Sequence, residues 1–253
     1  MVDFCLSHVS IPLTASVLDA GSGRNKVWFN ALPHKKKFEC ELEDGVDFLK
    51  LETHYDWIIG NPPFGNRSRD AIAFLKKALS LSNNVGFLLP ISFRKWSVQQ
   101  HIDKKARLVL DVDLPIDAFK IKGLRTCFQV WSTQDLRLTE KPSISHPDFE
   151  MWLYNDTKAS EGYFEEAWDF AVPRQGYFCV PRIGNVDYTT RATSKEQCDK
   201  RKHWMMFSAK TPEVLEQLLA IDYGLLAHKN TIIPGFGKAD VVAEYKNILK
   251  RIE

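Results

Sequence analysis

Short apolar segments alternate with amphipathic and polar ones along the first half of this chain. The apolar segments predict buried strands over residues 16–20, 36–41, 55–60, 85–91, 107–112 and 127–132. Helical spacing of apolar positions predicts helices over 2–8, 25–32 and 70–79, the last with Asp70 as its N-cap. Strands that alternate with helices are typical of an α/β fold, with a mostly parallel sheet covered on both faces. The last two strands have no helix between them, so we expect an antiparallel hairpin at one edge.

The pattern changes after residue 138. Residues 141–147 are polar and contain prolines, as linkers do, and no clear alternation of strands and helices follows them. A terminal helix is predicted over 240–252. We therefore expect two domains, an α/β domain over 1–138 and a smaller C-terminal region over 139–253.

The composition agrees with this division. A chain of 253 residues with 44% hydrophobic content is long enough for one α/β domain and a smaller unit. Its formal charge of +2 is nearly balanced, so the chain as a whole is not polybasic. The five cysteines form no Cys-x-x-Cys pair or His/Cys cluster, which argues against a zinc site and suits a reducing cytoplasm. No apolar run reaches membrane-spanning length and no signal-peptide pattern opens the chain, so we expect a cytoplasmic protein without metal or membrane contact.

A glycine-rich turn follows the first expected strand. Asp19 lies at the end of that strand, and Gly21 and Gly23 come directly after it. Glycines let the backbone approach a ligand closely. Open α/β sheets bind their ligands in crevices at the carboxyl ends of the strands. The turn is therefore a candidate nucleotide-type site.

The most informative segment is Asn61-Pro62-Pro63-Phe64, which directly follows the apolar run 57–60. The Asn61 side-chain oxygen and the Pro62 carbonyl can both accept hydrogen bonds from one amino group. The prolines hold the segment extended and stiff, and Phe64 is placed to lie on a flat ring. Such an arrangement grips an exocyclic amino group of a planar heterocycle and leaves its nitrogen lone pair free for attack on an electrophile. The alternative is a proline-stiffened turn after a buried strand.

In this context, the Asn-Pro-Pro-Phe segment resembles the catalytic motif of amino-methyltransferases that use S-adenosylmethionine. That family methylates N6 of adenine, N4 of cytosine, N2 of guanine or, more rarely, a glutamine amide. The turn with Asp19, Gly21 and Gly23 looks like the family's first cofactor motif. Ala20 departs from it where DNA-modifying members often carry proline, and Arg24 is unusual after the second glycine. The resemblance implies S-adenosylmethionine as cofactor and a Rossmann-like sheet with an antiparallel edge strand.

The same resemblance implies further cofactor ligands in the acidic segment between the two motifs. In the family, an acidic residue at the end of the second strand accepts hydrogen bonds from both ribose hydroxyls, which points to Glu41 or Glu39. An Asp-Phe pair further on meets the cofactor's adenine, which implies Asp47 as ligand of its amino group and Phe48 beside the ring. The family usually has a helix between these positions, and here we expect it to be missing or reduced to a turn. The alternative is an exposed acidic loop.

The order of the motifs, over about residues 1–135, resembles that of DNA adenine-N6 methyltransferases whose recognition region is C-terminal. The resemblance implies methylation of N6 of adenine in DNA after base flipping, by a stand-alone enzyme or by the modification partner of a restriction system. Cytosine N4 is a further target within this class. Outside this class, the sequence is also compatible with an RNA methyltransferase acting on adenine or guanine, a protein glutamine methyltransferase, or a degenerate fold that binds nucleic acid or a partner without catalysis. A homodimer and an assembly with a partner subunit both stay open.

Residues 173–203, here termed the basic segment, combine positive charge with aromatic rings. Its basic residues are Arg174, Arg182, Arg191, Lys195, Lys200, Arg201 and Lys202, and the aromatic ones within it or at its edge are Tyr177, Phe178, Tyr188 and Trp204. Cations neutralise phosphates and rings stack on bases, so the segment predicts a nucleic-acid contact surface. The alternative is a solvated basic face over core aromatics. Residues 235–238 are a further candidate phosphate loop, or else a plain turn before the terminal helix.

Overall fold

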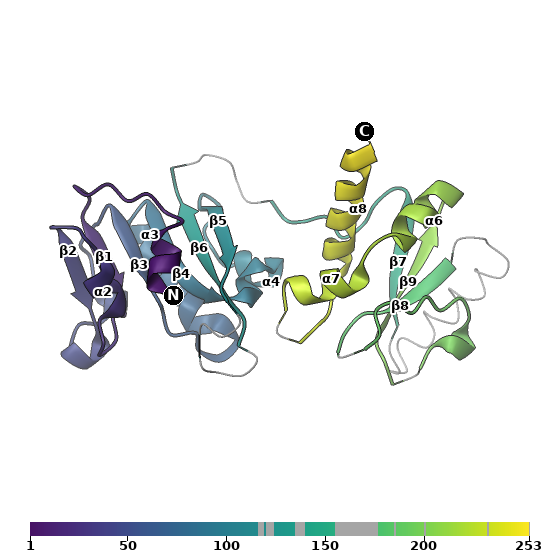
Figure 1. Ribbon diagram of the computed structural model, residues 1–253, viewed down its shortest axis with the longest axis horizontal. Coiled ribbons are helices and arrows are strands. Elements are labelled where there is room, and N and C mark those ends of the chain that lie inside the picture. Colours follow the sequence, from purple (N-terminus) through teal and green to yellow (C-terminus); the bar gives the residue numbers. More distant parts are fainter. Residues whose placement is uncertain are drawn as a thin grey trace. The chain divides into compact units, whose positions relative to one another are not determined.

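The computed structural model describes residues 1–115, 119, 124–134, 140–154, 177–184, 186–199, 201–231 and 233–252. The chain divides into two compact units, Met1–Lys141 and Pro142–Glu253 (Figure 1). Each unit has its own sheet and its own hydrophobic core.

The first unit is built on a six-stranded sheet. Its strands are β1 (Val17–Ala20), β2 (Lys37–Cys40), β3 (Trp57–Gly60), β4 (Asn84–Pro90), β5 (Arg107–Asp113) and β6 (Thr126–Ser132). They lie in the order β2-β1-β3-β4-β6-β5, and the first four run parallel (Figure 1). β6 runs antiparallel to both β4 and β5. The α/β class, the mostly parallel sheet and the antiparallel hairpin at its edge are therefore confirmed.

Apolar side chains cover both faces of this sheet. The flanking helices are α1 (Val2–Leu6), α2 (Val27–Ala31), α3 (Arg69–Leu81) and α4 (Trp96–Gln99). Successive residues of a strand point to opposite faces. Leu18 and Ile58 therefore pack in the core that contains the buried side of α3. Their neighbours Val17 and Ile59 pack in a second core with residues of α1 and α2.

Short 3₁₀ turns carry the loops at the candidate site: η1 (Leu42–Asp44), η2 (Phe48–Lys50), η3 (Asn66–Ser68) and η4 (Ile91–Arg94). η1 stands where a helix was expected to be missing or reduced to a turn. The N-cap prediction for Asp70 was wrong. The chain enters α3 through η3, so Ser68 takes the N-cap and Asp70 lies in the first turn. The Asp70 carboxylate lies against Gly65 instead.

The second unit is a three-stranded antiparallel sheet with helices. Its elements are β7 (Phe149–Tyr154), β8 (Tyr177–Pro181), η5 (Lys195–Gln197), β9 (Trp204–Ala209), α6 (Pro212–Leu219), α7 (Tyr223–Lys229) and α8 (Lys238–Ile252). β9 lies between β7 and β8. Thr211 caps α6 through its side chain, which accepts the Val214 N–H, and the core includes Phe207 and Tyr245.

α8 confirms the terminal helix predicted over 240–252 and begins two residues earlier. The Gly237 N–H donates to the Asp240 carboxylate at its start (2.8 Å). Phe236 is buried in the core of the second unit. Residues 235–237 therefore form the turn that leads into the helix, and Lys238 is the first helical residue.

Among the helices that the structure describes, none is long and apolar enough to cross a membrane. All five cysteines are buried and carry free thiols. Within the described residues there is no group of three or more His, Cys, Asp or Glu side chains that could hold a metal ion.

Candidate functional site

The Asn-Pro-Pro-Phe segment lies at the carboxyl end of β3, near the middle of the sheet. Pro62 is buried, Pro63 is exposed, and Asn61 and Phe64 are half-buried. The Asn61 Oδ1 atom is buried and has no hydrogen-bond partner among the described residues. A buried amide oxygen is costly to leave unpaired, and nearly all such atoms in folded proteins have a partner. Asn61 therefore offers an unused acceptor at the end of this strand.

Gly60 brings the ends of β1 and β3 together directly before Asn61. Its φ is +148°, and a Cβ there would lie 2.7 Å from the Ala20 carbonyl oxygen and 3.1 Å from Asp19 Oδ1. Any larger residue would push the two strands apart. The close approach at Gly60 therefore places the Asp19 carboxylate beside the start of the Asn-Pro-Pro-Phe segment.

Gly60→Ala is expected to lower the free energy of unfolding by about 1–3 kcal/mol, because the added methyl overpacks a backbone carbonyl. Gly86→Ala in β4 is the control. A Cβ at Gly86 meets a side-chain ring, that of Phe128, at 3.1 Å, so a smaller loss is expected. Urea unfolding of both variants measures the difference. Equal losses would show that the contact between Gly60 and Ala20 does not constrain the strand ends.

Asp19 is fully buried at the end of β1. Its Oδ2 accepts the Phe29 N–H at 2.9 Å, whereas its Oδ1 has no partner among the described residues. Burial raises the pKa of this carboxyl to about 7, against the opposing effect of the Phe29 hydrogen bond. Because the ionised Asp19 side chain is buried, it lowers the stability of the fold. The same ionised carboxylate would bind a positively charged group strongly.

The glycine turn after Asp19 packs on the end of β2. Gly21 (φ +73°) and Ser22 both donate their N–H groups to the Cys40 carbonyl at 3.1 Å. Gly23 (φ +65°) donates its N–H to Glu41 Oε2 at 2.7 Å. The Ser22 hydroxyl oxygen is buried without a partner among the described residues. The N–H groups of these three residues are thus used within the protein, and the Ser22 hydroxyl is the group that the turn leaves unpaired.

The two candidate ribose ligands, Glu41 and Glu39, differ in their contacts. Glu41 follows β2 directly. Its Oε2 accepts the Gly23 N–H of the glycine turn, and its Oε1 accepts the Leu42 N–H at 2.9 Å. Glu39 lies within β2 and forms an ion pair with Lys26. A carboxylate oxygen has capacity for more than one hydrogen bond. Glu41 therefore touches the glycine turn, whereas Glu39 keeps a buried oxygen, Oε2, without a partner among the described residues.

Asp47 and Phe48 lie at the start of η2. Asp47 caps this turn by accepting the Leu49 N–H at 3.0 Å. Phe48 is buried, and its ring lies against that of Phe74 on α3 with centroids 4.9 Å apart. Phe74 Cε1 also lies 3.6 Å from the position of a Cβ on Gly21. Phe74 therefore joins the glycine turn to Phe48. Its sequence pattern showed only an apolar helix position, so its place at the site was missed.

The loop after Phe64 is held by contacts within the first unit. Phe64 and Phe119 meet edge to face with ring centroids 6.5 Å apart. Ser68 and Ser92 are joined by a hydrogen bond of 3.1 Å between their hydroxyls. Arg94, at the end of η4, makes a bidentate ion pair with Asp111 on β5. This ion pair ties the loop after β4 to the edge hairpin, and sequence reasoning gave Arg94 no role.

Three of the four aromatic rings in or beside the basic segment do not form a stacking surface, and the fourth, Tyr177, is half-buried. Phe178, Tyr188 and Trp204 are buried within the second unit. The Tyr188 hydroxyl donates to the Gly184 carbonyl (2.7 Å), and the Trp204 indole N–H donates to the Asp199 carbonyl (3.0 Å). The prediction that these rings stack on bases was wrong, because large aromatic side chains contribute most by burial in the core.

Two arginines of the basic segment also have structural partners. Arg191 donates to the Tyr188 carbonyl at 2.8 Å and lies over the Tyr223 ring. Arg182 donates to the Phe236 carbonyl at 3.4 Å. Arg201 is exposed and forms an ion pair with Asp199, whose carboxylate offsets the positive charge of the arginine. Three further positions, Arg174, Lys200 and the side chain of Lys195, lie outside the described residues.

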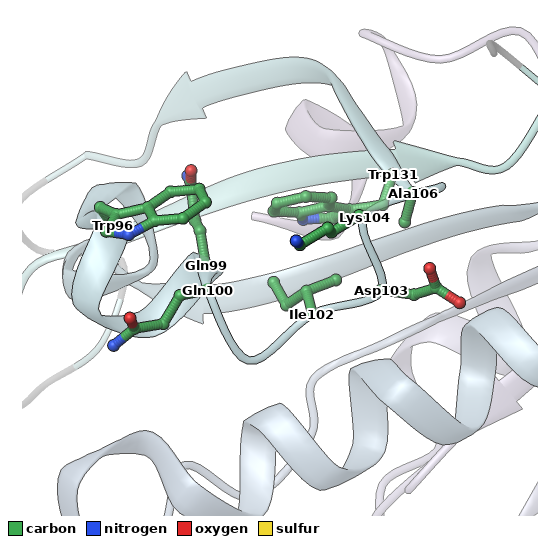
Figure 2. A pocket seen from close by; sticks show the side chains of 8 residues that line it. All are labelled: Trp96, Gln99, Gln100, Ile102, Asp103, Lys104, Ala106 and Trp131. Atoms are coloured by element: carbon green, nitrogen blue, oxygen red, sulfur yellow. The ribbon is translucent and has the colours of Figure 1, made fainter. Parts of the chain in front are cut away.

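Two hollows lie on the first unit, away from the glycine turn. Figure 2 shows a small one, of about 10 Å³, between α4, the turn after it and Trp131 of β6. That volume holds about one water molecule. The other is an open depression of about 530 Å³ beside η3 and the first half of α3.

The chain matches no protein-family model and no curated protein. Among solved structures it is similar to a Thermoplasma acidophilum protein, at 18% identity over 53% of this chain and 85% of that chain, with a TM-score of 0.41. It is also similar to the magnesium protoporphyrin IX methyltransferase of Synechocystis PCC 6803, solved with bound SAM, at 13% identity over 52% and 75%, TM-score 0.38. A third similar structure belongs to a type I R-M system, at 13% identity over 81% and 53%, TM-score 0.39. Likeness at this level assigns no activity, so function rests on the site itself.

Proposed function

We propose that this protein is an S-adenosylmethionine-dependent methyltransferase that methylates N6 of adenine in DNA. The observation that carries the proposal is the buried, unpartnered Asn61 Oδ1 at the end of β3. It lies in the Asn-Pro-Pro-Phe segment, and the residue before it, Gly60, packs closely against the end of β1 and Asp19. A buried acceptor that lacks a partner in the protein is free to accept a hydrogen bond from an amino group of the substrate.

The residues around the glycine turn fit the cofactor. Asp19 Oδ1 and the Ser22 hydroxyl are buried and without partners among the described residues. Gly21 and Gly23 adopt the left-handed backbone that lets a ligand approach closely. Glu41 would hold the ribose hydroxyls, Asp47 the adenine amino group, and Phe48 would lie beside the ring. Asp19 would face the positively charged end of the cofactor.

S-adenosylmethionine supplies a methyl group on a positively charged sulfur. Asn61 Oδ1 and the Pro62 carbonyl would accept the two amino hydrogens of the target base, which turns the nitrogen lone pair toward that methyl. Phe64 would stack on the base and offset part of the cost of flipping it, about a few kcal/mol. Catalysis would then be positioning and electrostatic stabilisation, and the proton lost from the methylated amino group would pass to water, so no general base of the protein is required. The second unit would serve as the target-recognition region, in a homodimer or together with a partner subunit.

The proposal predicts that tritium from labelled S-adenosylmethionine is transferred to DNA. Genomic DNA, total RNA and bulk protein are incubated in parallel with the full chain, and label is counted in each. Label in DNA supports the proposal. Label in RNA alone would replace it with an RNA methyltransferase. Label in none, with no cofactor binding by calorimetry, would favour a non-catalytic fold.

A further inference from the structure

The open depression on the first unit is basic and follows the Asn-Pro-Pro-Phe segment in the chain. It is lined by Asn66, Arg67, Arg69, Ile72, Lys76 and His101. Arg67 is only three residues after Phe64, so its Cα lies within about 11 Å of that of Phe64. We refer to this surface as the basic depression.

α3 supplies one wall of the basic depression. Arg69, Ile72 and Lys76 are spaced by three and four positions, which places them on one face of the helix. The two cations lie two turns apart, or about 10 Å along the axis. Ile72 is half-buried and packs on the core beneath. The wall is therefore a rigid helix face with an exposed cation at each end.

The cations of the basic depression carry no neutralising partner. Within the part of the chain that the structure describes, no ion pair is formed by Arg67, Arg69 or Lys76. The nearest acid in sequence, Asp70, has its carboxylate against Gly65. Elsewhere in the first unit, the exposed or half-buried cations Arg24, Lys26 and Arg94 each pair with a carboxylate. The whole chain has a net charge of only +2. The three unpaired cations of the basic depression therefore form a local concentration of positive charge.

The backbone holds this surface in a costly conformation. Arg67 (φ +52°) and Ser68 (φ +63°) are consecutive non-glycine residues in the left-handed region, which L residues adopt only with strain. The hydrogen bond between Ser68 and Ser92 holds the turn in place. Strain of this kind persists where surrounding contacts over-determine it, and it is concentrated at functional sites.

We propose that the basic depression binds the sugar-phosphate backbone of the substrate strand beside the nucleotide that enters the site. Arg67, Arg69 and Lys76 would neutralise phosphates, and Ile72 would lie beneath the sugars. The proposal rests on the proposed nucleic-acid function. Phosphate contacts fix the register of a strand without reading its sequence, which is what a site that must receive one flipped base requires. The first unit would then supply the backbone contacts that the basic segment of the second unit was expected to make.

The test is binding of a labelled 20-nucleotide single-stranded DNA to the full chain, without cofactor, over a range of salt concentrations. The variant is Arg69→Gln/Lys76→Gln, which keeps the helix and the aliphatic stems while removing two charges. The control is Lys35→Gln/Lys36→Gln, which removes two exposed charges directly before the edge strand β2, outside the basic depression. RNA of the same sequence forms a second arm.

We expect the Arg69/Lys76 variant to lose about tenfold or more in affinity at low salt. Its salt dependence should fall by about 1.4 in log–log slope, since each lost phosphate contact on a single strand is worth about 0.7. The control should change less than twofold, and the RNA arm should show the same pattern. Unchanged affinity and slope in the variant would overturn the proposal. This binding assay contains no cofactor, so its outcome is independent of methyl transfer. A loss of binding in the Arg69/Lys76 variant, together with no methylation of nucleic acid by the unmodified chain when S-adenosylmethionine is supplied, would refute the proposed function and leave this surface standing.

Discussion

Asn61→Ala is expected to reduce methyl transfer to DNA by at least about 100-fold, the effect of removing one well-placed hydrogen-bonding group from a transition state. Its stability should not fall. The Asn61 Oδ1 atom has no partner among the described residues, so its removal breaks no observed hydrogen bond and relieves the cost of a buried unpaired acceptor, and the free energy of unfolding should stay the same or rise by up to about 1–3 kcal/mol. Cofactor affinity, measured by calorimetry, should stay within twofold of the unmodified chain.

Asn83→Ala is the matched control. Asn83 precedes β4 at the opposite end of the sheet, and its side chain accepts a hydrogen bond from the Thr133 hydroxyl at 2.7 Å. This variant should lose about 0.5–1.5 kcal/mol of stability and keep full activity. The two variants thus have opposite profiles. An Asn61→Ala protein that retains more than a tenth of the transfer rate would show that this side chain does not hold the amino group.

Asp19→Asn is expected to stabilise the chain near pH 8 and to weaken cofactor binding. Burial raises the pKa of Asp19 from its usual value near 4 to about 7. The protonated carboxyl therefore favours the folded state, a contribution fully present below about pH 4 and lost as pH rises through 7. The asparagine variant does not ionise, so its advantage should grow from pH 4 to pH 8 and reach about 2–4 kcal/mol.

The affinity of the Asp19→Asn variant for the cofactor should fall, although its stability rises. Loss of a charge-assisted contact is worth about 1.5–3 kcal/mol, so binding of S-adenosylmethionine should weaken by about tenfold or more. A buried carboxylate that costs stability and is kept for binding is an expected trade-off at a functional site. A variant that binds the cofactor normally at pH 8 would show that Asp19 does not face its positive charge.

Asp56→Asn tests the sign of this pH dependence. Asp56 accepts hydrogen bonds from the Ser16 N–H and hydroxyl, which lower its pKa below the usual range. Its stabilising contribution is therefore present above its usual pKa and lost as pH falls. The asparagine variant should be less stable at neutral pH and approach the unmodified chain in acid. Urea unfolding from pH 2 to pH 8 measures the asparagine variants of Asp19 and Asp56 beside the unmodified chain.

Local patterns were sufficient for the sheet and for the position of the Asn-Pro-Pro-Phe segment within it. Apolar runs such as 57–60 and 85–91 are buried strands because a parallel sheet covered on both faces requires continuous apolar sequence. The Asn-Pro-Pro-Phe segment lies at a strand end because prolines cannot continue the ladder of hydrogen bonds. The reduced connection before Asp47 also followed from spacing alone, since too few residues remain for a helix.

The contacts that sequence reasoning missed are set by packing between distant segments. Phe74 has the pattern of any apolar helix residue, and only the fold places it between Gly21 and Phe48. Arg94 reaches Asp111 across 17 positions of sequence. Tyr188 and Trp204 were assigned to a nucleic-acid surface because composition cannot tell a stacking ring from a core ring. The site's unpartnered oxygens are likewise invisible before the side chains are placed.

The most direct test of the central claim is nucleoside mass analysis of DNA incubated with the full chain and S-adenosylmethionine, alongside the Asn61→Ala variant. We expect N6-methyldeoxyadenosine in DNA treated with the unmodified chain and a loss of at least about 100-fold with the variant. DNA that carries no methylated nucleoside, while the chain binds the cofactor, would contradict the proposed function.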